Sequence, residues 1–190
     1  MHTFTLPSGP EVGIVEMTGV EEDLLTNQRL IKTGEAVNQV LANCIKRVGD
    51  NDALGMKDIL DMLSGDRLFA LVRLRQVSLG DEVELELACP NMACGARTYV
   101  TINLEDLEVT PYPEEREFDF TLPGSGKAVR FGYLDGHKEK RLAALKQPSL
   151  TAAMMIRILS IDGQPPSKKH LNEMSMRDRS ALREEMTLAA

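Results

Sequence analysis

An internal repeat is the sequence feature that most constrains how this chain can fold. Residues 4–7 and residues 120–123 have the same sequence, Phe-Thr-Leu-Pro, at an offset of 116. A turn rich in Gly and Ser follows each copy, and a short apolar run follows each turn, at residues 12–17 and 128–134. A strand, a tight turn and a second strand form a β-hairpin, so the sequence predicts one hairpin in each half of the chain.

The segments after the two hairpins also match. Thr18 and Glu21 have the spacing of a capping box, and Asp135 marks a helix start in the second copy. Apolar residues at helical spacing predict one continuous helix over residues 37–48, and five of its six apolar positions stay apolar at residues 150–161, 113 positions later.

A third match places an Asp-Arg pair near the start of a later helix in each copy. Asp66 precedes Arg67, and Asp178 precedes Arg179, at an offset of 112. A carboxylate in the first turn of a helix complements the positive end of the helix dipole. We therefore interpret both Asp residues as structural.

These matches predict an α+β fold made of two degenerate copies of a β-hairpin-plus-helices unit, with a further β-hairpin inserted between them. The expected boundaries are residues 1–75 for the first copy, 76–115 for the inserted hairpin with its linker, and 116–190 for the second copy. Because a two-stranded hairpin alone is marginally stable, we expect the copies to pack as a pseudo-symmetric pair.

The inserted segment alternates in the manner of a strand. Glu82, Glu84 and Glu86 alternate with apolar residues, and residues 98–104 alternate again, which predicts a hairpin with an acidic face and an apolar face. The three glutamates have two interpretations. They are a solvated face that discourages edge-to-edge aggregation, or they dock on a basic partner surface.

Two cysteines, Cys89 and Cys94, lie at the predicted tip of the inserted hairpin. Three interpretations stay open: a structural tip, a zinc site completed by ligands from elsewhere, and a disulfide. Four residues separate the cysteines, where a zinc knuckle has two, and the sequence has no second Cys or His pair. Cys44 lies on the apolar stripe of the helix and is expected in the core. We expect no cofactor, with zinc at the tip as the one alternative.

Charge and motifs exclude several functions. With 29 acidic and 22 basic residues the net charge is -7, which disfavours binding to nucleic acid and to anionic membranes. No apolar run reaches the roughly 20 residues that span a bilayer, so we expect a soluble protein of the cytosol. The sequence has no HExxH, GxSxG, phosphate-loop or dinucleotide-binding motif, and we expect no enzymatic activity.

The order of motifs from residue 4 into the inserted hairpin resembles the baseplate protein family of T-even-type contractile-tailed bacteriophages, the family of the baseplate hub assembly protein. The motifs are Phe4-x-Leu6-Pro7-Ser8-Gly9, Thr18-Gly19-x-Glu21-Glu22, the Asp66-Arg67 helix with Leu71-Val72-Arg73-Leu74-Arg75, and Ser78-x-Gly80.

The resemblance implies a non-enzymatic structural or assembly component of a phage tail baseplate, or of a related contractile injection particle. The implied partners are the baseplate hub or other phage tail proteins, and the implied location is the virion tail baseplate after assembly in the host cytoplasm. One alternative is a tail assembly chaperone that is absent from the finished particle. A zinc-dependent nucleic-acid adaptor that uses the cysteine tip is a more distant one, and a hydrolase is the last.

Overall fold

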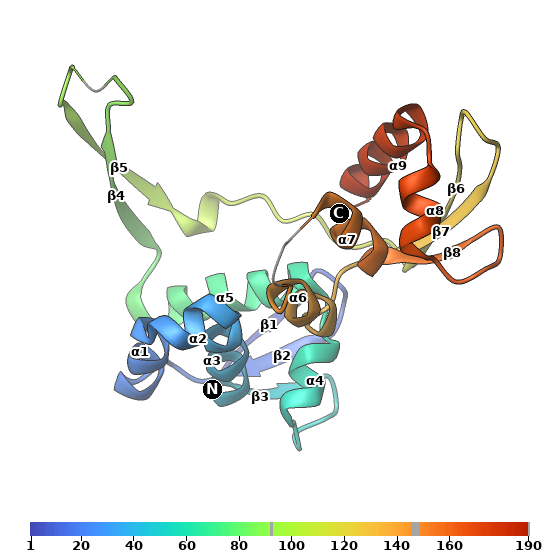
Figure 1. The fold of residues 1–190 in the computed structure, drawn as a ribbon. Helices are drawn as coiled ribbons and strands as arrows, with labels where there is room; N and C mark the ends of the chain where they lie inside the picture. Colours follow the sequence, from blue (N-terminus) through green and yellow to red (C-terminus); the bar gives the residue numbers. More distant parts are fainter. Residues whose placement is uncertain (92, 146–148, 190) are drawn as a thin grey trace.

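The protein is a mixed α+β molecule with two packed bodies and one projecting hairpin (Figure 1). The structure, a computed structural model, describes residues 1–91, 93–145 and 149–189. We call residues 1–79 the N-terminal body, and residues 117–145 with 149–189 the C-terminal body. This architecture confirms the predicted α+β class.

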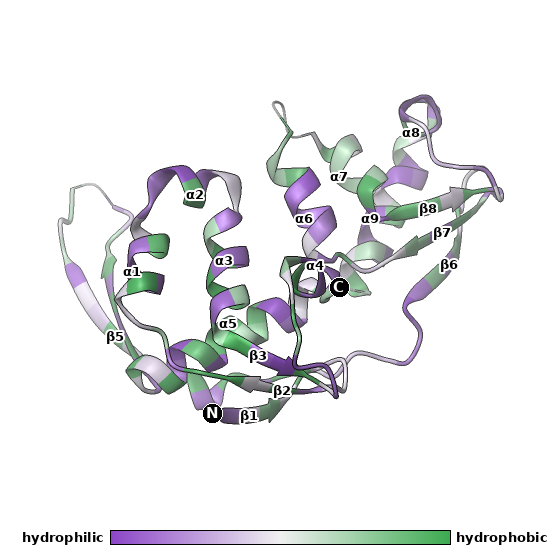
Figure 2. Cartoon of the chain, turned by 90° about the horizontal axis from the view of Figure 1, so that it is seen from below, coloured by the Kyte–Doolittle hydropathy of each residue, from purple (hydrophilic) through white to green (hydrophobic). Residues whose placement is uncertain are grey.

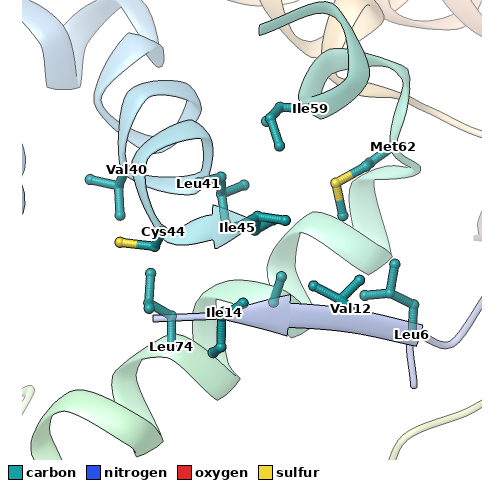
Figure 3. Packing of buried hydrophobic residues seen from close by; sticks show 11 residues of the cluster. Leu6, Val12, Ile14, Val40, Leu41, Cys44, Ile45, Ile59, Met62 and Leu74 are labelled. Atoms are coloured by element: carbon teal, nitrogen blue, oxygen red, sulfur yellow. The ribbon is translucent and has the colours of Figure 1, made fainter. Parts of the chain in front are cut away.

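The N-terminal body is a three-stranded antiparallel sheet packed against helices. Its elements are β1 (His2–Thr5), β2 (Glu11–Ile14), α1 (Gly19–Thr26), α2 (Gln28–Thr33), α3 (Glu35–Cys44), β3 (Ile45–Val48), α4 (Met56–Asp61) and α5 (Ser64–Leu79). The strand order is β1-β2-β3. Val12 and Ile14 of the central strand are fully buried against α3, α4 and α5, with Leu41, Ile59 and Leu74 around them (Figure 3). Burial of these aliphatic side chains holds the helices on the sheet.

The C-terminal body has the same sequence of elements with one helix fewer among the described residues. They are β6 (Glu117–Thr121), β7 (Ala128–Gly132), α6 (Gly136–Ala143), α7 (Leu150–Arg157), β8 (Ile158–Ile161), α8 (Lys168–Glu173) and α9 (Met176–Leu188). The strand order is β6-β7-β8, again antiparallel. Val129 and Phe131 of the central strand are fully buried, with Leu171 and Leu182 among their neighbours in the core.

The two sheets share an irregularity. The pairing of β2 with β3 shifts register between Gly13 and Ile14, and the pairing of β7 with β8 shifts between Arg130 and Phe131. A β-bulge at the same step of the central strand bends both sheets in the same place. Common ancestry of the two bodies stays a prediction from the sequence.

The prediction of one continuous helix over residues 37–48, and over residues 150–161, is wrong. α3 ends at Cys44 and α7 ends at Arg157, and the chain continues directly as β3 and β8. The β-branched residues Ile45 and Val48 pair with Ile14 and Val12 of β2. A third strand gives the central strand a hydrogen-bonding neighbour on each side, which a hairpin alone lacks.

Asp66 and Asp178 lie in the first turns of α5 and α9, as predicted, but they also bond to the hairpin turn of their own body. Asp66 Oδ1 accepts from Ser8 N at 3.0 Å. Asp178 Oδ1 accepts from Gly124 N at 2.5 Å, and its Oδ2 from Ser125 N at 3.1 Å. Each carboxylate therefore fixes one sheet to one long helix.

The pKa values of these two carboxyl groups are shifted in opposite directions. Burial raises the pKa of Asp66 above its ordinary value, because the hydrogen bonds from Ser8 compensate only in part. Burial acts in the same direction on Asp178, but hydrogen bonds from Gly124, Ser125 and Ser175 outweigh it and lower the pKa of that carboxyl.

Helix α6 joins the two bodies. It belongs to the C-terminal body but lies on the helices of the N-terminal body (Figure 1). Before it, Leu63 and Asp135 form an antiparallel bridge, in which Ser64 N donates to Leu134 O at 2.9 Å. Along the helix, ion pairs bridge the two bodies. They are Arg67 with Glu139 at 3.1 Å and Glu35 with Lys140 at 2.6 Å. A hydrogen bond between Asp61 and the His137 ring, at 3.0 Å, also joins the two bodies.

The linker between the hairpin and the C-terminal body is held at both bodies. Tyr112 N donates to Pro7 O at 2.9 Å, and the Tyr112 hydroxyl accepts from Gly65 N at 3.1 Å. The Tyr112 ring also meets the ring of Tyr133 edge to face, with 4.6 Å between centroids. Tyr112 therefore contacts both bodies, and these contacts add to those between α6 and the N-terminal body.

Candidate interaction surfaces

The inserted segment forms the predicted hairpin, and it projects from the end of α5 away from the C-terminal body (Figures 1 and 2). Its strands are β4 (Glu82–Ala88) and β5 (Arg97–Asn103), followed by the short helix η1 (Leu104–Asp106). The seven residues of β4 all pair with β5. At the base, Arg75 of α5 donates to the carbonyl oxygens of Gly80 and Glu82, which fixes where the hairpin leaves the body.

One face of the hairpin carries Glu82, Glu84 and Glu86, as predicted. Glu82 and Glu84 are exposed, whereas Glu86 forms an ion pair with Arg97 of the neighbouring strand. Residues 81–108 contain seven acidic residues and one basic residue, so this segment carries six of the seven net negative charges of the whole chain. Four of these acidic residues lie on or beside β4 and three lie on η1 and the linker, so the hairpin and the segment after it together produce a strong local negative field.

The opposite face of the hairpin is apolar and uncovered. Val83, Leu85 and Leu87 stand opposite Ile102, Val100 and Thr98, and Leu85 and Leu87 are 38% and 49% exposed. Within the described residues the sheet has two strands, so both strand edges offer unpaired backbone groups. A hairpin of this kind buries too little apolar area to be stable alone and gains from a partner.

The tip holds Cys89 and Cys94 as free, exposed thiols, while Cys44 is buried in the N-terminal core as predicted. The tip backbone is ordered by Cys89 N donating to Ala96 O at 2.8 Å and Cys94 N donating to Asn91 O at 2.9 Å. Met92, within the predicted tip, lies outside the described residues. Among the residues that the structure describes, no three Cys, His, Asp or Glu side chains come together to hold a metal. Zinc at the tip would need ligands from another chain, and it stays a prediction.

A groove of about 530 Å³ lies beneath the linker, and the sequence analysis did not find it. Leu68, Phe69 and Val72 of α5 form one wall, and Leu107 and Val109 of the linker form another. Residues distant in the sequence complete the groove, among them Pro7, Tyr133 and Leu188, so local patterns gave no signal for it. Its largely apolar lining suits an apolar segment rather than a charged ligand.

None of the helices in the described ranges has the length and apolar character needed to span a bilayer. The molecule is thus defined by two packed α+β bodies, a projecting acidic hairpin and an apolar groove, a set of features suited to protein-protein contact.

Comparison with known families agrees with this class. The family model described as T4 bacteriophage base plate protein matches residues 1–178 of the 190 residues. The chain belongs to this family and is a phage baseplate protein. No curated protein and no solved structure matches the chain.

Proposed function

We propose that this baseplate protein is a structural component of the phage tail, held in place by contacts with other tail proteins through its projecting hairpin. The observation that carries the proposal is the concentration of negative charge on residues 81–108. Such a field attracts a basic partner over several ångströms and repels acidic surfaces, which favours one docking orientation. The proposal gives the protein no catalytic role.

Glu82 and Glu84 are the residues we assign to partner binding, since both are exposed and Glu86 already pairs with Arg97. The apolar face with Leu85 and Leu87 supplies the area that is buried on docking. Charge directs the encounter, and apolar burial stabilises the complex.

Quantitative mass spectrometry of purified phage particles tests the proposal. We expect the chain in the finished particle at a fixed ratio to a known tail subunit. The alternative, a tail assembly chaperone, predicts that the chain occurs in infected cells and in tail precursors but not in finished particles. Absence from the particles would reject the structural role.

A further inference from the structure

The contact between the two bodies shows how one body of this fold accepts a helix from another. Arg67 of the N-terminal body is 3% exposed beneath α6 and donates from Nε to Glu139 Oε2. Gly136, the first residue of α6, lies so close that an added Cβ would come within 2.7 Å of Arg67 Nη1. A glycine at the helix start and a glutamate three residues later therefore allow the close approach.

Arg179 occupies the same place in the C-terminal body. Arg67 Nη1 donates to Ile59 O, the carbonyl in α4, at 2.9 Å, and Arg179 Nη1 donates to Leu171 O in α8 at 2.7 Å. The second terminal nitrogen of Arg67 donates to Asn38 in α3, and that of Arg179 donates to Thr151 in α7. Arg179 Nε, the position that binds Glu139 in Arg67, has no partner in residues 1–91, 93–145 or 149–189.

The counterpart of α6 in the N-terminal body is α1. Both helices follow the second strand of a sheet, and both begin with a glycine after an N-cap residue, Gly19 after Thr18 and Gly136 after Asp135. Glu22 stands three residues after Gly19, as Glu139 stands three residues after Gly136. A Cβ on Gly19 would meet open space, and Gly19 is not among the positive-φ glycines, so neither packing nor backbone conformation within the chain requires a glycine there.

The two unoccupied faces complement each other. On α1, Val20 is 61% exposed and Glu22 and Asp23 are exposed. On the C-terminal body, Met176 at the start of α9 is 78% exposed and Leu150 of α7 is 48% exposed. Arg179 and Arg183 follow Met176 in α9 at positions i+3 and i+7, so these three residues share one side of the helix. The acidic α1 with its exposed Val20 is thus complementary to the side of α9 that carries Met176, Arg179 and Arg183.

We propose that a second copy of this chain docks its α1 on the α7, α8 and α9 face of the C-terminal body, as α6 docks on the N-terminal body. Glu22 of one copy pairs with Arg179 of the next, and Gly19 allows the approach. The residues that correspond to Asp61 and His137 are Glu173 and Val20, so that hydrogen bond is not reproduced. The contact is heterologous, because each copy uses two different faces, and it generates a ring or a filament. This inference does not depend on the docking role of the hairpin.

Two variants of the full chain each block one face and keep the fold. Gly19→Gln places a side chain in space that is open in the single chain. Met176→Asp adds a negative charge in the first turn of α9, which favours the helix but repels the acidic α1 of the next copy. Leu79→Asp at the end of α5 is the control, since it also introduces a charge at an exposed apolar residue, 69% exposed, but lies on neither face and outside the hairpin strands. Circular dichroism and thermal melting verify that each variant is folded.

Sedimentation velocity over a range of protein concentrations gives the result. We expect the wild type and Leu79→Asp to associate equally, and each face variant to associate at least about tenfold more weakly. High salt should weaken the association of the wild type. In an equimolar mixture, the Met176→Asp variant still has an intact α1, and the Gly19→Gln variant still has an intact α9 face. These two faces can form one contact, so association in the mixture should end at a dimer.

Three results would overturn the inference. They are a wild type that stays monomeric, face variants that associate as the wild type does, and a mixture that forms no dimer although the wild type associates. If the wild type is monomeric and the Gly19→Gln variant is not incorporated into particles, the α1 face binds a different tail protein. That result would reject the second copy as the partner.

Discussion

Arg67 and Glu139 form an ion pair across the boundary between the two bodies, with Arg67 3% exposed and Glu139 40% exposed. Replacing Glu139 by Ala leaves a buried guanidinium with one partner fewer. Because Glu139 is partly solvated, we expect a loss of about 1–2 kcal/mol in the free energy of unfolding. Urea denaturation measures it, with the exposed Glu184→Ala in α9 as the control. Equal stability of the two variants would show that the pair contributes nothing to the joint.

The pKa shifts of Asp178 and Asp66 have opposite signs, so we expect these two residues to make the stability of the fold depend on pH in opposite ways. The folded pKa of Asp178 lies below its ordinary value of 3.8, so its ionised form stabilises the fold above that pH, and this contribution is lost as the pH falls through the folded pKa. The folded pKa of Asp66 is raised, so its contribution is present at low pH and is lost as the pH rises through the folded pKa.

We therefore expect Asp178→Asn to be destabilised at pH 7, with a deficit that shrinks as the pH falls below about 4. Asn also loses one acceptor for the two backbone donors, Gly124 N and Ser125 N. Asp66→Asn, which keeps one acceptor for Ser8 N, should show a smaller loss at pH 7. Urea denaturation at several pH values compares the two variants. A larger neutral-pH loss for Asp66→Asn would contradict this account.

The three cysteines should differ sharply in reactivity. Burial raises the pKa of the Cys44 thiol to about 11, and its side chain is 1% exposed, whereas Cys89 and Cys94 are exposed. A chromogenic disulfide reagent should titrate two thiols rapidly in the native protein and a third only on unfolding. Protection of the two tip thiols that is removed by a chelator would instead indicate bound metal, and protection removed by a reductant would indicate a disulfide.

Local patterns predicted those parts of the fold that short segments determine. The hairpins, the capping box of Thr18 with Glu21 and the alternating inserted strands all depend on neighbours a few residues away. The change from helix to strand at Ile45 was missed because Ile45 and Val48 continue the helical spacing, while their pairing with β2 is a long-range contact. In the C-terminal body the equivalent pairing of β8 with β7 determines the end of α7 at Arg157.

The candidate interaction surfaces were predictable only where local sequence determines them. Alternation located the acidic face of Glu82, Glu84 and Glu86, but the pairing of Glu86 with Arg97 depends on the strand register. The groove was not predictable, because it requires the linker to return along α5. The close contact of Gly65 with the Tyr112 hydroxyl, which fixes that return, joins residues 47 positions apart.

The central claim is that the hairpin docks the protein in the baseplate, and its removal tests this claim most directly. Glu82 pairs with Asn103, so residues 82–102 can be replaced by a short Gly/Ser turn without moving either end. A companion variant with Glu82→Lys and Glu84→Lys keeps the hairpin and reverses its free charges. We expect both variants to be folded and soluble, and the amount of each incorporated into purified particles, measured by quantitative mass spectrometry, to fall to background for the deletion and severalfold for the charge reversal. Incorporation of the folded deletion variant at the wild-type level would contradict the docking role.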